Sequence, residues 1–146
     1  LLQRMGDLRE AAKSFRTAIQ RAPTEAEPHN ALGVLEASRG NVRLAEAHYN
    51  DAIRNNPAHV TARHNLALLY AGQVKKVDAA LRLWRELLAQ SPDFLAARLS
   101  LAETLLEQQR PSESLVELTD LLQRQPDYAT ARVKLADALR LLDRHE

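Results

Sequence analysis

The chain has 146 residues, of which 45% are hydrophobic, 27% charged and only 4% aromatic. This helix-forming composition and length allow one domain with a substantial core. The formal net charge of +1 gives no electrostatic basis for binding nucleic acid or an anionic membrane. The absence of cysteine excludes disulfides, thiol catalysis and zinc–thiolate sites. No apolar run approaches the roughly 18 residues that a membrane-spanning segment needs.

Residues 1–25 contain one predicted helix that ends before Pro23. Gly6 and Asp7 are predicted to form a turn ahead of it, and Asp7 with Glu10 has the spacing of a capping box. Residues 1–5 read as the end of a preceding helix. We therefore expect the chain to be a fragment of a larger protein whose targeting signals lie upstream, and the sequence indicates no compartment.

Residues 26–59 contain two predicted helices separated by a turn at residues 40–41. Apolar residues of the second helix recur at the i, i+4, i+7 and i+8 positions of a helical face, as Ala45, Tyr49, Ala52 and Ile53. Asn41 stands where its side chain can cap that helix. Pro57 ends it, because proline lacks the amide hydrogen and clashes with the preceding turn.

The same pattern continues through residues 60–94 and 95–128, and residues 129–146 supply one further helix. The period is 34 or 35 residues and is shared by prolines (Pro23, Pro57, Pro92, Pro126), leucines (Leu32, Leu66, Leu101, Leu135) and small residues (Ala11, Ala45, Ala80, Ser114). The one extra residue falls between Leu66 and Ala80, and residues 72–76 are its predicted site, in a turn. Such self-similarity is typical of a stacked repeat architecture.

These residues resemble the tetratricopeptide repeat family over essentially the whole chain. Residues 26–59 match its pattern best, with Leu32-Gly33, Gly40, Ala45, Tyr49, Ala52 and Pro57. The resemblance implies an all-α fold, an α-solenoid that winds as a right-handed superhelix of antiparallel helix–turn–helix repeats. We expect one array with a partial repeat at 1–25, full repeats at 26–59, 60–94 and 95–128, and a partial repeat at 129–146.

The resemblance also implies a concave groove, lined mainly by first helices, that binds an extended peptide or a partner protein. The groove residues predicted here are Asn30, Val34, His64, Asn65, Leu68, Leu99, Glu103, Lys134 and Asp137. The asparagines would bond a peptide backbone, and Val34, Leu68 and Leu99 would give apolar pockets. The alternative is that each is a solvated or inter-repeat residue. A clamp for a C-terminal carboxylate is disfavoured, because only Asn65 fits and no cation accompanies it.

Catalysis, cofactors and metals are not expected from the sequence. The histidines are His29, His48, His59, His64 and His145, and no two of them have the i, i+3 or i, i+4 spacing of a helical metal site. Arg63, Arg98 and Arg132 recur once per repeat. They form either a stripe that faces an acidic partner or a set of ion pairs with acids on adjacent repeats.

The leading hypothesis is a non-catalytic scaffold for protein–protein interaction, with a weak lean towards bacterial envelope, secretion or polysaccharide-export assemblies. One alternative is the regulatory or substrate-docking region of an enzyme such as a glycosyltransferase. Another is a self-assembling scaffold, because Leu135, Leu139 and Leu142 leave an apolar stripe at the end of the array. Self-association through the array ends would then occur at high concentration.

Overall fold

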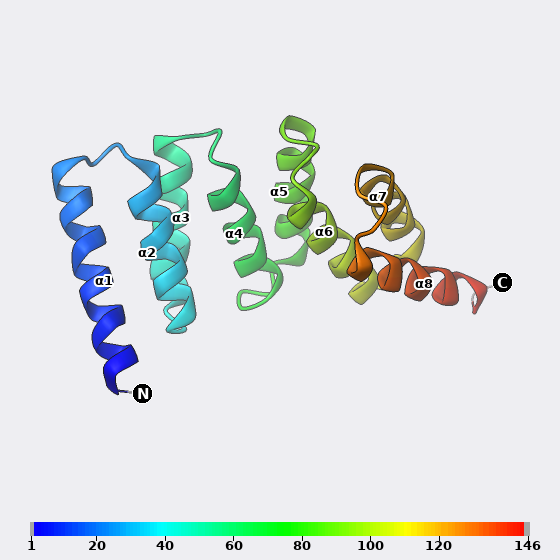
Figure 1. Cartoon of the computed structure of the whole chain (residues 1–146), viewed down its shortest axis with the longest axis horizontal. Helices are drawn as coiled ribbons and strands as arrows, with labels where there is room; N and C mark the ends of the chain where they lie inside the picture. The colour runs from blue at the N-terminus through cyan, green and yellow to red at the C-terminus, as the bar shows by residue number, and fades with distance from the viewer. Residues whose placement is uncertain (1, 145–146) are drawn as a thin grey trace. The chain divides into compact units, whose positions relative to one another are not determined.

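The computed structural model describes residues 2–144, and its regular secondary structure over that range is entirely α-helical (Figure 1). The helices are α1 (Leu2–Arg21), α2 (Ala26–Ser38), α3 (Val42–Asn55), α4 (Val60–Ala71), α5 (Val77–Gln90), α6 (Leu95–Glu107), α7 (Pro111–Arg124) and α8 (Ala129–Asp143). The predicted all-α fold class of sequential helix pairs is confirmed. None of these helices combines the length and the apolar character needed to cross a bilayer.

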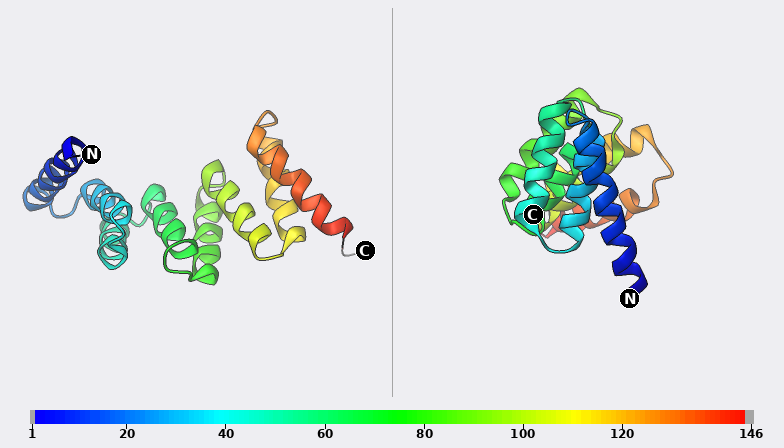
Figure 2. Two further views of the ribbon diagram at one scale, coloured as in Figure 1. Left: turned by 90° about the horizontal axis from the view of Figure 1, so that it is seen from below. Right: turned by 90° about the vertical axis from the view of Figure 1, so that its left-hand side faces the viewer.

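The helices form two compact units, one made by α1–α4 and the other by α5–α8. In the first unit each helix packs on the next, and α2 also touches α4. In the second unit the helices again pack consecutively, and α6 touches α8. Within each unit, the antiparallel course of successive helices can be followed in Figure 2. The contacts of α2 with α4 and of α6 with α8 are of the kind that stacked helical hairpins produce, because each hairpin covers an apolar face of its neighbour.

Proline ends the odd-numbered helices, as the sequence predicts. The helices α1, α3, α5 and α7 stop two residues before Pro23, Pro57, Pro92 and Pro126 respectively. A backbone hydrogen bond closes the turn that follows each of them. The donor–acceptor pairs are Glu25–Ala22, His59–Asn56, Phe94–Ser91 and Tyr128–Gln125. One turn geometry is therefore repeated along the chain.

Left-handed residues occur in the turns that follow α2, α4 and α6. Gly40, Lys75 and Gln109 have φ angles of 78°, 55° and 56° and stand one period apart. Only Gly40 adopts this conformation without the steric penalty of a Cβ atom. The expected site of the extra residue is confirmed, since 72–76 is the turn between α4 and α5 and is longer than the equivalent turns at 39–41 and 108–110.

Two local predictions are wrong. The helix α1 runs without interruption through Gly6 and Asp7, so no turn or capping box forms there. A glycine inside a helix costs only about 1 kcal/mol, and the flanking residues favour helix strongly enough to override it. Asn41 occupies the N-cap position of α3, but its side chain makes no cap and instead donates to the carboxylate of Glu36 at 2.7 Å. Because Glu36 is buried, its charge requires such a partner.

The core lies between the paired helices, where small residues meet large ones. Ala45, Ala80 and Ser114 are fully buried, as are the bulky side chains that follow them at i+4: Tyr49, Trp84 and Leu118. Ser114 satisfies its hydroxyl by donating to the backbone carbonyl of Ala102 at 2.8 Å. The helices α2 and α3 approach closely, because a Cβ atom added to Gly33 would lie 2.5 Å from the ring of Tyr49.

Replacing Gly33 by alanine is expected to destabilise the protein, because the added methyl group clashes with a buried ring. The loss should be about 1–3 kcal/mol, the usual cost of overpacking a core. Gly6→Ala is the matched control. A Cβ atom there meets nothing within 4 Å, so the same change in a helix should stabilise by up to about 1 kcal/mol. Urea unfolding of both variants measures the difference, and equal effects would contradict the packing described for Gly33.

Candidate functional site

A hollow of about 370 Å³ opens on the first unit between α2 and α4. It is lined by residues of both helices, of the turn after α4 and by Tyr49 of α3. The lining residues are Val34, Ala37, Tyr49, Asn65, Leu68, Leu69, Gly72 and Gln73. Val34 and Leu68 are 47% and 43% exposed, which is high for large apolar side chains. Three of the predicted groove residues, Val34, Asn65 and Leu68, are therefore brought together around one hollow.

The two predicted groove asparagines bond to each other across successive first helices. Asn65 on α4 donates to the side-chain oxygen of Asn30 on α2 at 3.0 Å. Asn30 is only 4% exposed, so its main role is to join the two helices. The bond uses one of the two N–H groups of Asn65, whose side chain is half-buried and keeps further donor and acceptor capacity. Asn65 is thus the asparagine that a ligand in the hollow can reach.

The remaining predicted groove residues lie elsewhere. His64, on α4, is half-buried, and burial lowers its pKa. In the second unit, Leu99 is half-buried against the core of α6–α8. Glu103 on α6 and Lys134 on α8 form an ion pair at 3.8 Å. Asp137 pairs with Arg140 one turn along α8. Glu103, Lys134 and Asp137 are thus held by partners within the second unit.

Arg98 and Arg132 have different surroundings, so the three arginines do not form a stripe of equivalent side chains. Arg98 is almost buried and bonds the carboxylates of Glu117 at 2.7 Å and Asp120 at 3.0 Å. These acids stand on α7, in the same predicted repeat, and not on an adjacent repeat as expected. Arg132 is exposed and donates to the carbonyl oxygen of Pro126. Arg98 therefore links α6 to α7 through ion pairs.

Histidines from two helices meet in the first unit, which the sequence spacing did not reveal. One ligand-type atom from each of His29, His48 and Asp51 lies within 4.8 Å of the other two. His48 and Asp51 share a face of α3, whereas His29 stands on α2, too far along the chain for a helical motif search to link it. Burial and the neighbouring His29 lower the pKa of His48. His59 is engaged elsewhere, with Glu27 at 2.9 Å, and His145 lies outside the described residues.

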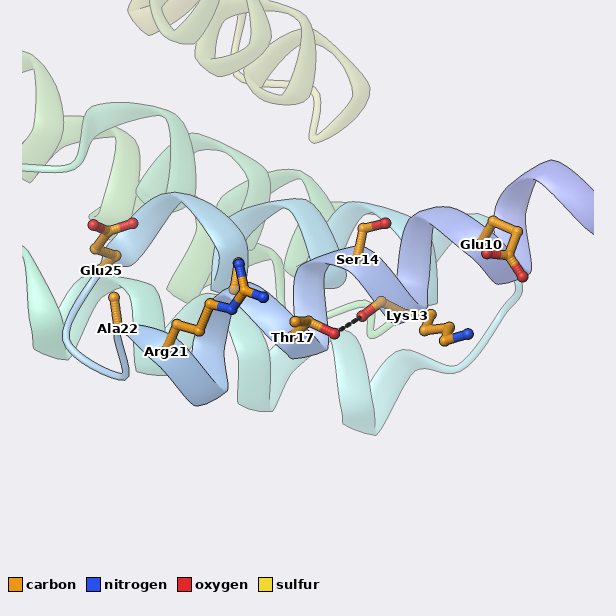
Figure 3. A pocket seen from close by; sticks show the side chains of 8 residues that line it. Glu10, Lys13, Ser14, Thr17, Arg21, Ala22 and Glu25 are labelled. Atoms are coloured by element: carbon orange, nitrogen blue, oxygen red, sulfur yellow. Dashed lines mark hydrogen bonds between the residues drawn. The ribbon is translucent and has the colours of Figure 1, made fainter.

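A second hollow, of about 570 Å³, runs along α1 (Figure 3). Most of its lining is polar or charged: Glu10, Lys13, Ser14, Thr17, Ala18, Arg21, Ala22 and Glu25. Thr17 turns back to donate to the carbonyl oxygen of Lys13 at 3.0 Å, as the dashed line in Figure 3 shows. A ligand bound there would have to desolvate several charged side chains, so this hollow is a weaker candidate for binding an apolar segment than the one between α2 and α4.

Comparison with family models gives one family over most of the chain. Models described as tetratricopeptide repeat match residues 1–60, 30–79 and 68–131. Such repeats generally mediate protein–protein interaction and are typically non-catalytic. A search of curated proteins finds no match.

Solved structures of repeat proteins are similar to this chain in fold. A tetratricopeptide repeat protein of Parabacteroides merdae is 20% identical, with a TM-score of 0.84 over 96% of this chain and 56% of its own. PilF of Pseudomonas aeruginosa is 21% identical, with a TM-score of 0.83 over 95% and 63%. YrrB, a repeat protein with an unusual peptide-binding site, is 21% identical, with a TM-score of 0.75 over 88% and 66%. This chain therefore spans between about half and two thirds of each.

Stability is expected to fall as the pH rises from about 10 to 12. Burial raises the pKa of Tyr49 to about 12. Burial and then the bond to Glu46, at 2.6 Å, do the same for Tyr70. Below pH 10 both phenols are neutral in either state. Between the ordinary pKa near 10 and the raised value only the unfolded chain loses these protons, which favours unfolding.

Urea unfolding across this pH range, for the native chain and for Tyr70→Phe, measures the effect. The variant should lose stability less steeply with pH, because one late-titrating phenol has been removed. Parallel slopes for the two proteins would show that Tyr70 ionises as readily in the folded state as in the unfolded one.

Proposed function

Since this chain belongs to the tetratricopeptide repeat family, we propose that it is a non-catalytic scaffold that binds an extended peptide segment of a partner protein in the hollow between α2 and α4. The observation that carries the proposal is the pair of exposed apolar side chains at the hollow, Val34 and Leu68. They stand 34 residues apart, at equivalent positions of successive first helices. Burying both against a partner would remove apolar surface from water, which favours association.

The spacing of these two side chains favours a particular peptide conformation. The helices α2 and α4 touch each other, and packed helices have axes about 8–10 Å apart. A polyproline II segment returns to the same face every three residues, or roughly every 9 Å. A peptide in that conformation with apolar side chains three residues apart would place one beside Val34 and the next beside Leu68. The side chain of Asn65 would then be available to its backbone.

The proposed scaffold is one array of repeats over the whole chain. The repeats are those at residues 26–59, 60–94 and 95–128, with partial repeats at 1–25 and 129–146. On the second unit, the half-buried Leu99 with Glu103, Lys134 and Asp137 would form a separate binding surface. Self-association through the array ends is the competing use of the molecule. Light scattering over a range of concentrations separates the two, because peptide binding in the hollow does not require a dimer.

The proposal can be tested without knowing the partner by selecting ligands from a phage-displayed random peptide library on the whole chain. Fluorescence polarisation then gives the Kd of each enriched peptide for the native chain and for Val34→Asp and Leu68→Asp. We expect each substitution to weaken binding at least about tenfold, because a charge would be desolvated against apolar peptide side chains. Enriched peptides should carry apolar residues three positions apart.

Leu44→Asp is the matched control, because Leu44 is an equally exposed leucine (53%) on α3 that does not line the hollow. Its Kd should equal that of the native chain. Peptides that bind Val34→Asp and Leu68→Asp as tightly as the native chain, or that are lost on Leu44→Asp, would contradict a binding site between α2 and α4.

A further inference from the structure

His29, His48 and Asp51 form a cluster of three potential metal ligands inside the hairpin of α2 and α3. His48 and Asp51 are three residues apart and so lie on one face of α3. The ring centroids of His29 and His48 are 6.1 Å apart. The distance from Nδ1 of His29 to Oδ2 of Asp51 is 3.9 Å, too long for a hydrogen bond. The three groups converge on one point without bonding one another.

The Nδ1 atoms of His29 and His48 are both buried, and neither has a hydrogen-bond partner. Leaving a buried polar atom unpaired costs free energy, typically about 1–3 kcal/mol, so such atoms call for an explanation. His29 is only 9% exposed, and its other ring nitrogen, Nε2, lies 3.4 Å from the carbonyl oxygen of Pro23. Because a carbonyl accepts from an N–H group, we assign the ring proton of His29 to Nε2, which leaves a lone pair on Nδ1. A backbone carbonyl on the outer nitrogen is the usual way in which proteins orient a metal-binding histidine.

The second unit shows what the same three positions hold elsewhere in the chain. Each recurs 69 residues later, as Arg98, Glu117 and Asp120. There the guanidinium of Arg98 lies between the two carboxylates and also donates to the carbonyl oxygen of Pro92 at 3.1 Å. This position in the fold thus accommodates a cation, oriented by the carbonyl of Pro92, which is equivalent to the Pro23 carbonyl that faces His29.

In the hairpin of α2 and α3 the arginine is replaced by His29 and the glutamate by His48. The set changes from one cation between two acids to two imidazoles and one carboxylate. Each of these three groups can donate a lone pair to a metal ion, and imidazole with carboxylate suits zinc and similar divalent transition ions. Oδ1 of Asp51 forms an ion pair with Arg54 at 3.0 Å, which orients the carboxylate and leaves Oδ2 towards His29.

We propose that His29, His48 and Asp51 bind a zinc ion or a similar divalent transition metal that ties α2 to α3. Zinc–nitrogen bonds of about 2.0–2.1 Å in a tetrahedral site put ligand atoms roughly 3.3 Å apart. Small rotations of the side chains bring the three groups from their present separation to that distance. Water fills the fourth position. This inference is independent of the peptide site, because none of its residues lines the hollow between α2 and α4.

Isothermal titration calorimetry of the metal-free whole chain with zinc chloride tests the site. We expect one zinc ion per chain and a melting temperature that rises with zinc concentration, since binding to the folded state alone stabilises it. His48→Gln and Asp51→Asn should each weaken this binding at least about tenfold. His64→Gln is the matched control, because His64 is another half-buried histidine of the same unit, and its affinity for zinc should equal that of the native chain.

Nitrogen NMR of the imidazole rings gives a readout that altered stability would not reproduce. On addition of zinc, the resonance of Nδ1 of His29 should shift as its lone pair is taken up, while Nε2 keeps its proton. Absence of zinc binding, or binding equally tight in His48→Gln, Asp51→Asn and the native chain, would overturn the proposal. Loss of binding in His64→Gln would do the same.

Discussion

Close approach of paired helices is the constraint on which the rest of this molecule depends. The ring of Tyr49 occupies the space where any residue but glycine at position 33 would place its Cβ atom. Ala45, one turn earlier on α3, is also completely buried. Side chains of ordinary size at these positions would separate α2 from α3. Because a single hairpin cannot cover its own apolar face, the stacking of each hairpin on the next depends on this contact.

The same packing positions both candidate sites. Tyr49, whose ring packs where a side chain at position 33 would lie, also lines the hollow with Val34 and Leu68. On the same hairpin, His29 of α2 faces His48 and Asp51 of α3. Arg98 shows the stable outcome in the second unit, a guanidinium held by carboxylates. The helix packing is thus shared between repeats of this chain, while the residue types at its polar positions differ.

The sequence predicts the fold well because the fold is governed by local and periodic signals. The prolines that end helices, the buried leucines, and the alanines followed four residues later by an aromatic residue each specify structure within one helix or between neighbouring helices. The prediction of a turn at Gly6 is wrong because the neighbouring residues favour helix strongly. The prediction of a helix cap at Asn41 is wrong because its side-chain amide donates to the buried carboxylate of Glu36. The sequence also cannot show that Asn65 bonds Asn30 or that His29 meets His48. These contacts depend on side-chain rotamers and on the distance between helices, which no spacing rule encodes.

A double-mutant cycle between Gly33 and Tyr49 tests the central packing contact most directly. The stabilities of Gly33→Ala, Tyr49→Leu and the double variant are measured by urea unfolding against the native chain. If the ring is what excludes a side chain at position 33, the alanine should cost less once the ring is gone, and the coupling energy should be about 1 kcal/mol or more. Additive effects of the two substitutions would contradict the account, because they would mean that the cost at Gly33 does not arise from Tyr49.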